Sequence, residues 1–193
     1  METQAFPLDP WEIKMNKKHI FKEIAKFCAQ VAVMFAVVFV LTRCVIIHAQ
    51  VISPSMEDTL PTWSWVVGSR LSYVIGEPHR FDIILFENPI NPSDHPFVKR
   101  IIGLPHETVE IRDGLVFIDG SDIPLDDTFT KEPSFGNHGP FLVPADSFFV
   151  LGDHRNNSAD SRNLANPFIH RDVIIGRLHA TLLPRPAIFR RPS

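Results

Sequence analysis

A single long apolar segment near the N-terminus constrains this chain more than any other feature. Residues 27–42 read FCAQVAVMFAVVFVLT, with one glutamine as the main polar residue. A helix needs about 20 apolar residues to cross a bilayer, and the flanking Lys22, Lys26 and Arg43 lengthen the run by reaching toward the headgroups. We therefore expect residues 24–44 to form one transmembrane anchor. A cleaved signal peptide and a buried helix are the alternatives, and no convincing small-residue cleavage site favours the first.

The charges around this segment indicate its orientation. Residues 1–23 are polar and rich in lysine. Lysine-rich flanks remain in the cytoplasm by the positive-inside bias. We therefore expect residues 1–23 to form a cytoplasmic segment, and residues 45–193 to form one domain on the outer face of the membrane.

Composition favours a β-rich domain and argues against some functions. The chain has 193 residues, of which 45% are apolar, and it contains 16 Phe and 17 Pro. These residue types in short β-branched runs are typical of strands joined by irregular loops. The net charge of −3 argues against nucleic-acid binding. Cys28 and Cys44 lie in or beside the apolar segment, so neither can cross-link the domain.

The pattern after residue 45 alternates apolar runs with turn residues and has no helical period. Strands are expected at residues 45–52, 81–86, 97–104, 108–111, 115–118, 148–151 and 173–178. Asp113-Gly114 predicts a hairpin turn. Residues 131–140 are expected to be a loop, and the chain after residue 178 a basic, proline-rich tail. The pattern therefore predicts an all-β catalytic domain.

A serine-containing stretch follows the anchor at residues 53–60 (SPSMEDTL). A serine hydroxyl is a weak nucleophile that needs an adjacent base. Histidine is the usual base, and the domain has several. A lysine serves only when it is neutral, and burial among apolar groups lowers its pKa. Lys99 lies inside the apolar run of residues 97–102, where it is either a buried base or a solvent-facing residue of an alternating strand. The pattern alone leaves these alternatives open.

Four motifs resemble those of type I signal peptidases, the membrane-bound Ser-Lys proteases of peptidase family S26. They are residues 53–60 (SPSMEDTL), 81–86 (FDIILF), 99–107 (KRIIGLPHE) and 152–162 (GDHRNNSADSR). Their order and spacing agree with the family from the anchor to about residue 178. The resemblance implies a mostly β fold, in which one transmembrane helix precedes a catalytic domain of coiled antiparallel sheets. It also implies a serine endopeptidase that removes N-terminal signal peptides from exported pre-proteins after Ala-x-Ala-like sites.

The resemblance also implies a role for each motif residue. Ser55 is similar to the nucleophile and Lys99 to the general base. Ser53 resembles the side-chain donor of the oxyanion hole, partnered by the backbone N–H of Ser55. Ser158 resembles the serine that orients the lysine amine. The residues expected to give structural support are Arg100, Asp153, Asp160 and Arg162.

The substrate is expected to bind as an added strand, with small side chains in two shallow pockets. By position, the pockets are expected to be lined by Val51, Met56, Leu60, Phe97 and Val98. The expected partners are signal peptides and membrane lipid, with no nucleic acid, and the domain would act close to the protein-export channel. Trp63 and Trp65 are either membrane-interface residues or core. Because Ser and Lys suffice for the chemistry, no metal or organic cofactor is expected.

Three positions depart from the family pattern. Asp58 replaces a proline, His106 a glycine and His154 an asparagine. A carboxylate close to Lys99 would raise the pKa of its amine, so we expect Asp58 to point away. The departures keep two alternatives open, a specialised S26 protease for a narrow set of substrates such as pilus subunits, and a silent scaffold that binds signal peptides without cutting them.

Overall fold

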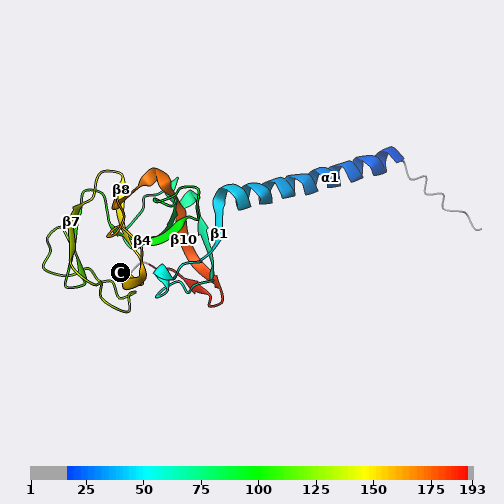
Figure 1. Ribbon diagram of the computed structural model, residues 1–193. Helices are drawn as coiled ribbons and strands as arrows, with labels where there is room; N and C mark the ends of the chain where they lie inside the picture. The colour runs from blue at the N-terminus through cyan, green and yellow to red at the C-terminus, as the bar shows by residue number, and fades with distance from the viewer. Residues whose placement is uncertain (1–16, 191–193) are drawn as a thin grey trace, which may run out of the picture. The chain divides into compact units, whose positions relative to one another are not determined.

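The computed structural model describes residues 17–190 in two compact units, one ending at Leu41 and the other beginning at Thr42 (Figure 1). Each unit is considered by itself. Most of the expected cytoplasmic segment, residues 1–16 of 1–23, lies outside the described residues.

The first unit is one long helix. Helix α1 covers Lys17–Val40 and continues as a short π-helical segment, Leu41–Val45. An α-helix rises about 1.5 Å per residue, so 24 residues reach across the roughly 30 Å hydrocarbon core of a bilayer. The mean hydropathy of its most apolar stretch is 2.3, and its side chains are exposed. By length and composition the helix is able to span a membrane, which confirms the expected N-terminal apolar helix.

The second unit is built from eleven described strands joined by turns and short 3-10 segments. The strands are β1 Ile46–Gln50, β2 Trp65–Ser69, β3 Ile83–Phe86, β4 Phe97–Gly103, β5 Thr108–Arg112, β6 Leu115–Ile118, β7 His138–Leu142, β8 Ser147–Leu151, β9 Phe168–His170, β10 Ile174–Leu183 and β11 Ala187–Ile188. Among the described residues after Val45 there is no α-helix. The mostly β prediction is therefore confirmed.

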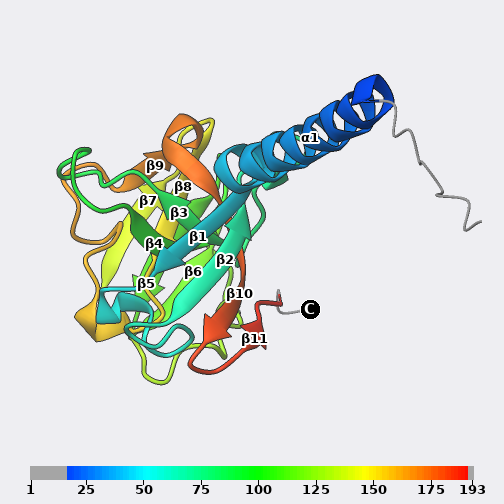
Figure 2. The same ribbon diagram turned by 90° about the vertical axis from the view of Figure 1, so that its right-hand side faces the viewer.

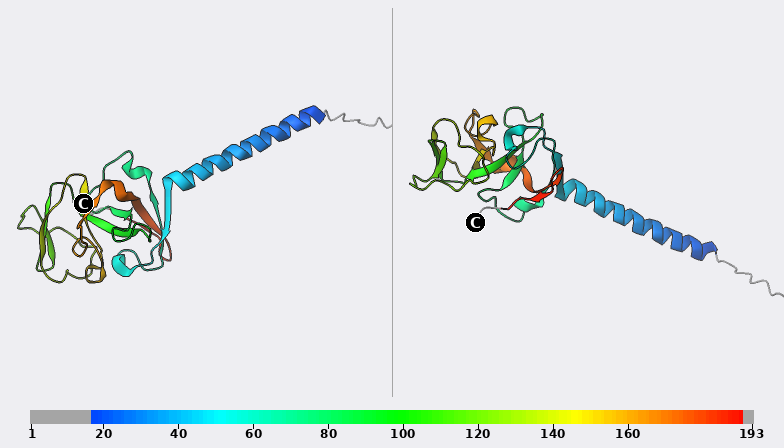
Figure 3. Two further views of the ribbon diagram at one scale, coloured as in Figure 1. Left: turned by 45° about the horizontal axis from the view of Figure 1, so that its top comes forward. Right: turned by 90° about the horizontal axis from the view of Figure 1, so that it is seen from below.

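The strands form two antiparallel sheets. The larger one has the order β1-β2-β10-β3-β4-β8-β9, with β11 paired to β10 (Figure 2). The smaller one has the order β6-β5-β7 and lies on the far side of the domain from β1 (Figures 1 and 3). Strands β3 and β4 are central in the larger sheet, and β1 is at its edge. The 3-10 turn Pro54–Met56 that follows β1 contacts the central strand β4.

Register and alternation fix what β4 presents on each face. Ile84 pairs with Lys99, and Leu85 pairs with Val98. Successive side chains of a strand point to opposite faces. Val98 and Leu85 accordingly pack with one apolar cluster, and Ile84 with another. The amine of Lys99 is therefore anchored on a strand whose neighbours are apolar on both faces.

The strand positions differ from the sequence expectation in several places. Strands β2 and β9 were not expected, and two segments expected to be irregular contain strands. Residues 131–140 were expected to be a loop, but β7 begins at His138, where it adds an edge to β5. The tail after residue 178 was expected to be irregular, but β10 continues to Leu183 and pairs with β2 and β11. Both segments carry prolines, and the strands β5 and β2, far away in sequence, supply pairing partners for them.

Two turns show how local residue choice meets backbone geometry. The expected hairpin is present, with φ of 49° at Asp113 and 81° at Gly114, and it joins β5 to β6. Between β4 and β5, His106 has φ of 71°. Its backbone N–H donates to the Val143 carbonyl, and its side chain is exposed. A non-glycine residue in this left-handed region costs about 1–2 kcal/mol. The chain therefore keeps the turn, at that cost, with a histidine where the family pattern has a glycine.

We predict that His106→Gly raises the free energy of unfolding by about 1 kcal/mol, because glycine adopts positive φ without steric cost. For a chain of this size the melting temperature of the full-length protein should rise by about 2–4 °C. His106→Ala is the control, since it removes the imidazole but retains the strain and should give no such gain. Equal stabilisation by both variants, or by neither, would contradict the prediction.

Candidate active site

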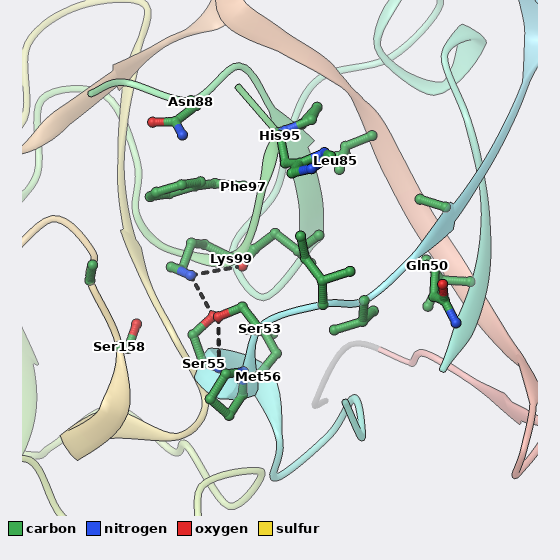
Figure 4. Close-up of a pocket in the computed structure, with 18 of the residues that line it drawn as sticks. Gln50, Ser53, Ser55, Met56, Leu85, Asn88, His95, Phe97, Lys99 and Ser158 are labelled. Atoms are coloured by element: carbon green, nitrogen blue, oxygen red, sulfur yellow. Dashed lines mark hydrogen bonds between the residues drawn. The ribbon is translucent and has the colours of Figure 1, made fainter. Parts of the chain in front are cut away.

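The side chains of Lys99 and Ser55 meet in the interior of the domain. Ser55 lies in the 3-10 turn Pro54–Met56 that follows β1, and Lys99 lies on β4. The Lys99 Nζ donates to the Ser55 Oγ at 2.6 Å (Figure 4). The two residues are only 4% and 5% exposed. The chain thus brings an amine and a hydroxyl from positions 44 residues apart into a direct buried hydrogen bond.

The amine of Lys99 has few polar neighbours. Besides Ser55, its Nζ donates to the Val98 carbonyl at 3.1 Å. It also lies 5.2 Å from the centre of the Phe97 ring. None of the ion pairs among residues 17–190 includes this amine. The setting therefore differs from that of a surface lysine paired with a carboxylate.

Burial lowers the pKa of the Lys99 amine from 10.5 to about 8. Loss of hydration is the largest cause, because it disfavours the charged form. The carboxylates of Asp160 and Asp153 act in the opposite direction, and the guanidinium of Arg162 reinforces the lowering. With a pKa near 8, about a tenth of the amine is neutral at pH 7. A neutral amine is able to accept the Ser55 proton, which is the requirement for a lysine base.

Ser53 and Ser55 are linked at the start of the 3-10 turn. Ser53 has extended backbone angles, and its Oγ accepts the backbone N–H of Ser55 at 3.3 Å. This is an N-cap interaction, which serine side chains favour. The two groups expected to form the oxyanion hole therefore lie next to each other, and in this structure they are bonded to each other.

Ser158 lies close to the site because residue 152 is a glycine. A Cβ at Gly152 would lie 2.2 Å from the Ser158 Oγ and 2.4 Å from the Ser55 carbonyl oxygen. Only the absence of a side chain lets the two loops come this close. The Ser158 hydroxyl is buried and has no hydrogen-bond partner among the described residues. It faces the Lys99 amine in Figure 4, but no hydrogen bond joins them, so its orienting role stays a prediction.

Two buried ion pairs lie beneath these loops. Arg100 follows Lys99 on β4, and its Nε and Nη2 donate to the two oxygens of Asp153 at 2.8 and 2.6 Å. It also donates to the Phe81 carbonyl and to Thr59. Bidentate arginine–carboxylate pairs are geometrically specific. This pair ties the Lys99 strand to the loop after β8.

The second pair, between Arg162 and Asp160, closes that loop on itself. The Nε and Nη2 of Arg162 donate to Asp160 at 2.8 Å each. Asp160 also accepts the backbone N–H of Gly152 at 3.0 Å. Arg162 further donates to Ser134 and to the Arg155 carbonyl. All four residues expected to give support therefore take part in the two pairs, with Arg100 bound to Asp153 rather than to Asp160.

Sequence reasoning missed a third buried pair, between Arg155 and Asp127. Arg155 is 2% exposed, and its Nη1 lies 2.7 Å from Asp127. Its Nε donates to the Gly152 carbonyl at 3.2 Å. Arg155 belongs to a motif that was recognised, but Asp127 lies in an irregular segment without a pattern. The only sequence signal was an arginine inside a stretch expected to be close to the site.

The departures from the family pattern leave the Ser55–Lys99 pair intact. Asp58 points away as expected, since it accepts the Lys131 backbone N–H at 2.9 Å and lies 3.4 Å from the Lys131 amine. The His154 ring contacts the Pro54 carbonyl at 3.3 Å, and its backbone N–H donates to the Ser55 carbonyl. No described histidine hydrogen-bonds the Ser55 hydroxyl, which favours the lysine base over the histidine alternative.

A cleft of about 1020 Å³ opens beside the pair. Of the expected pocket residues, Val51, Met56, Phe97 and Val98 line it. Leu60 does not, because it is fully buried in the core below. Sequence reasoning missed Ala49, Val66 and Leu85, which also line the cleft. They lie on β1, β2 and β3, and only the sheet order brings them together.

Metal ligands are not clustered in the described part of the chain. No group of three His, Cys, Asp or Glu residues among residues 17–190 is arranged to hold a metal ion.

Comparison with known proteins gives consistent matches. Signal peptidase I of Leptolyngbya laminosa is 43% identical over 131 residues, which cover 65% of this chain and 63% of that protein. The probable signal peptidase I-2 of Synechocystis sp. is 35% identical over 144 residues, 70% of this chain and 62% of that protein. The chain thus spans less than two thirds of the length of these relatives. A crystal structure of a signal peptidase I from Enterococcus faecalis V583 is 33% identical, with a TM-score of 0.45, and covers 53% of this chain and 97% of that one.

The family comparison covers most of the chain. Residues 24–183 match the family described as signal peptidase, peptidase S26. This range contains the apolar helix beyond its first turns, every described strand except β11, and the turn and strand that carry Ser55 and Lys99. The chain belongs to the signal peptidase family, peptidase S26.

Proposed function

We propose that this chain is a signal peptidase I, a membrane-anchored serine endopeptidase that removes N-terminal signal peptides from exported pre-proteins. The observation that carries the proposal is the 2.6 Å hydrogen bond between Lys99 Nζ and Ser55 Oγ in a buried setting that lowers the amine pKa to about 8. A serine and a neutral amine in this arrangement can perform acyl transfer.

In the proposed reaction the neutral Lys99 amine accepts the Ser55 proton as the Ser55 Oγ attacks the scissile carbonyl carbon. The carbonyl oxygen becomes an oxyanion, which the backbone N–H of Ser55 and the hydroxyl of Ser53 stabilise. As the carbon–nitrogen bond breaks, the Lys99 ammonium gives the proton to the leaving amine. A water then attacks the acyl–Ser55 ester with the same amine as base, which frees the signal peptide and restores Ser55.

The cleft supports a substrate bound in an extended form. One wall of the cleft is formed by the end of β1 and the residues between β1 and Ser55. The opposite wall is formed by the start of β4. An extended segment between them finds backbone groups on both sides. The apolar lining near Val51, Val98 and Leu85 suits small apolar residues such as Ala at the first and third positions before the cut.

The apolar helix supports the proposed location. We place it as residues 24–44 of a single-pass anchor, with residues 1–23 in the cytoplasm and the domain on the outer face of a bacterial cytoplasmic membrane. Signal peptides, which carry their own apolar segment, reach the same membrane during export. Activity close to the export channel follows from that shared location.

The first test is cleavage of a model pre-protein by the purified full-length chain in detergent, with N-terminal sequencing of the product. We expect one cut after an Ala-x-Ala-like site. Ser55→Ala and Lys99→Met should each lower the rate at least about 1000-fold, because the two groups act as a unit. Lys131→Met, at an exposed lysine that pairs with Asp58, is the matched control and should retain activity. Full activity of Ser55→Ala would overturn the nucleophile assignment.

The second prediction concerns pH. Because burial lowers the pKa of the Lys99 amine to about 8, kcat/KM should rise with pH through a single limb near pH 8 and level off above it, as the neutral base accumulates. Since no described histidine bonds the Ser55 hydroxyl, His154→Asn should leave the limb in place. A limb near pH 6.5, abolished in His154→Asn, would instead indicate a histidine base.

The third prediction concerns Gly152. A Cβ there would overlap with the Ser158 hydroxyl and the Ser55 carbonyl, so Gly152→Ala must move one of the two loops. A displacement of about 1 Å at a reacting group costs roughly 100-fold in rate, and we expect a loss of that order in kcat. Gly120→Ala is the control, because a Cβ at that turn glycine has no neighbour within 4 Å. Its φ of 69° should cost about 1 kcal/mol of stability but should leave kcat unchanged. Unimpaired activity of Gly152→Ala would show that the loop contact is dispensable.

A further inference from the structure

One segment outside the four motifs contacts residues of all four. Residues 127–135, here called the connecting segment, lie between β6 and β7 of the smaller sheet and form neither helix nor strand. The contacts with motif residues are made by Asp127 with Arg155, Phe129 with Phe81 and Arg100, Lys131 with Asp58, and Ser134 with Arg162. The smaller sheet supplies neither Ser55 nor Lys99, but this segment links it to the motifs that do.

Two of these contacts show that the connecting segment is packed on the site. The Ser134 hydroxyl is 5% exposed and accepts Nη1 of Arg162 at 2.6 Å. The backbone N–H of Lys131 donates to Asp58 at 2.9 Å, whereas the Lys131 side chain is 72% exposed. The backbone of Lys131 therefore makes the main bond to Asp58, and its side chain is dispensable for that contact.

Asp127 is the counter-ion of a buried arginine. Arg155 is 2% exposed, and its Nη1 lies 2.7 Å from the Asp127 carboxylate. None of the other ion pairs among residues 17–190 includes Arg155, and its Nη2 has no hydrogen-bond partner within that range. A buried charge that loses its partner is strongly unfavourable. Asp127 therefore stabilises the charged Arg155 side chain where it lies.

Arg155 in turn connects two parts of the loop after β8. Its Nε donates to the Gly152 carbonyl at 3.2 Å, and its own carbonyl accepts Nη2 of Arg162 at 2.6 Å. Gly152 is the residue whose missing side chain leaves room for Ser158 and for the Ser55 carbonyl. A shift of the Arg155 side chain therefore displaces the loop at the point where it touches the turn that carries the nucleophile.

The same loop carries the charged groups that act on the Lys99 amine. These groups are the carboxylates of Asp160 and Asp153 and the guanidinium of Arg162. On the turn that carries Ser55, the carboxylates of Glu57 and Asp58 bind Thr62 and the connecting segment instead. Loss of hydration is the largest cause of the lowered pKa of Lys99. A displaced loop that admits water to the amine therefore raises this pKa toward its ordinary value of 10.5.

We propose that Asp127 is a positioning residue, which acts through Arg155 to hold the loop after β8 against Ser55 and Lys99. The inference rests on the proposed function, because it takes Ser55 and Lys99 as the reacting pair. Asp127 does not line the cleft, so its loss should act on the rate of the chemical step more than on substrate binding. The smaller sheet thereby contributes to catalysis without touching the substrate.

The test is Asp127→Ala in the full-length chain, assayed on a model pre-protein across pH. Because the loop is displaced by about 1 Å, kcat at pH 7 should fall on the order of 100-fold. KM should change less than about threefold, since no contact with the substrate is lost. The basic limb of the pH profile should move upward by about one unit as the amine gains water. A smaller folded fraction alone would lower the rate at every pH and leave the limb in place.

Asp126→Ala is the matched control. Asp126 carries the same charge at the adjacent position, is exposed, and forms no ion pair with any residue of the described range 17–190. The control should keep both the rate and the limb of the unmodified chain. Equal losses in the two variants, or an unmoved limb in folded Asp127→Ala, overturn the inference.

A second variant separates positioning from stability. Asp127→Ala leaves a buried charge unpaired and lowers stability, whereas Asp127→Ala combined with Arg155→Met removes both charges, a replacement that is often neutral for folding. The double variant still lacks the Nε donor to Gly152, so it should fold and keep the low kcat and the raised limb. Its kcat should be no lower than that of Arg155→Met alone, because Asp127 acts through Arg155. Full activity of the folded double variant overturns the inference.

An NMR titration separates this inference from the proposed function. Isotope-labelled lysine in the full-length chain reports the pKa of Lys99 without turnover, and the signal is assigned by its absence in Lys99→Met. A pKa that rises in Asp127→Ala and not in Asp126→Ala supports the role of Asp127, even where the unmodified chain cleaves no pre-protein and the proposed function fails. Cleavage by Asp127→Ala with an unchanged rate, limb and pKa refutes that role and leaves the proposed function standing.

Discussion

The burial of one lysine amine against one serine hydroxyl is the constraint on which the rest of this domain depends. Removing a charged ammonium from water costs free energy. In this domain that cost lowers the pKa of the amine, and no carboxylate among the described residues forms an ion pair with it. The carboxylates of Asp153 and Asp160 lie near enough to oppose that shift. Each is held by an arginine, Arg100 and Arg162 respectively. The two ion pairs thus fix the loops around Lys99, and the positive charge of Arg162 offsets part of the effect of the carboxylates on the pKa.

The sequence allowed much of this arrangement to be predicted, because the relevant signals are local. Apolar runs located the helix and most strands, Asp113-Gly114 located a hairpin, and motif order paired Ser55 with Lys99. The choice between a lysine and a histidine base was open from the pattern and rested on resemblance alone. The structure adds the reason, a direct bond at 2.6 Å between two buried side chains.

What the sequence did not predict depends on tertiary placement. Asp127 reaches Arg155 from an irregular segment, and Leu60 packs into the core below the cleft rather than lining it. Strand β7 exists because β5 offers it a partner, although its own residues have little strand character. In each case the informative partner lies beyond the reach of a local pattern.

The bond between Ser53 and Ser55 bears on how the proposed reaction would gain its rate. In the resting chain the Ser55 N–H is already satisfied by the Ser53 Oγ. A neutral substrate carbonyl that displaces this bond exchanges one neutral hydrogen bond for another, worth about 1 kcal/mol either way. An oxyanion gains a charge-assisted bond from the same N–H and a second one once the Ser53 hydroxyl rotates to donate. The exchange therefore favours the transition state over the bound substrate, which is the condition for an interaction to accelerate the chemical step.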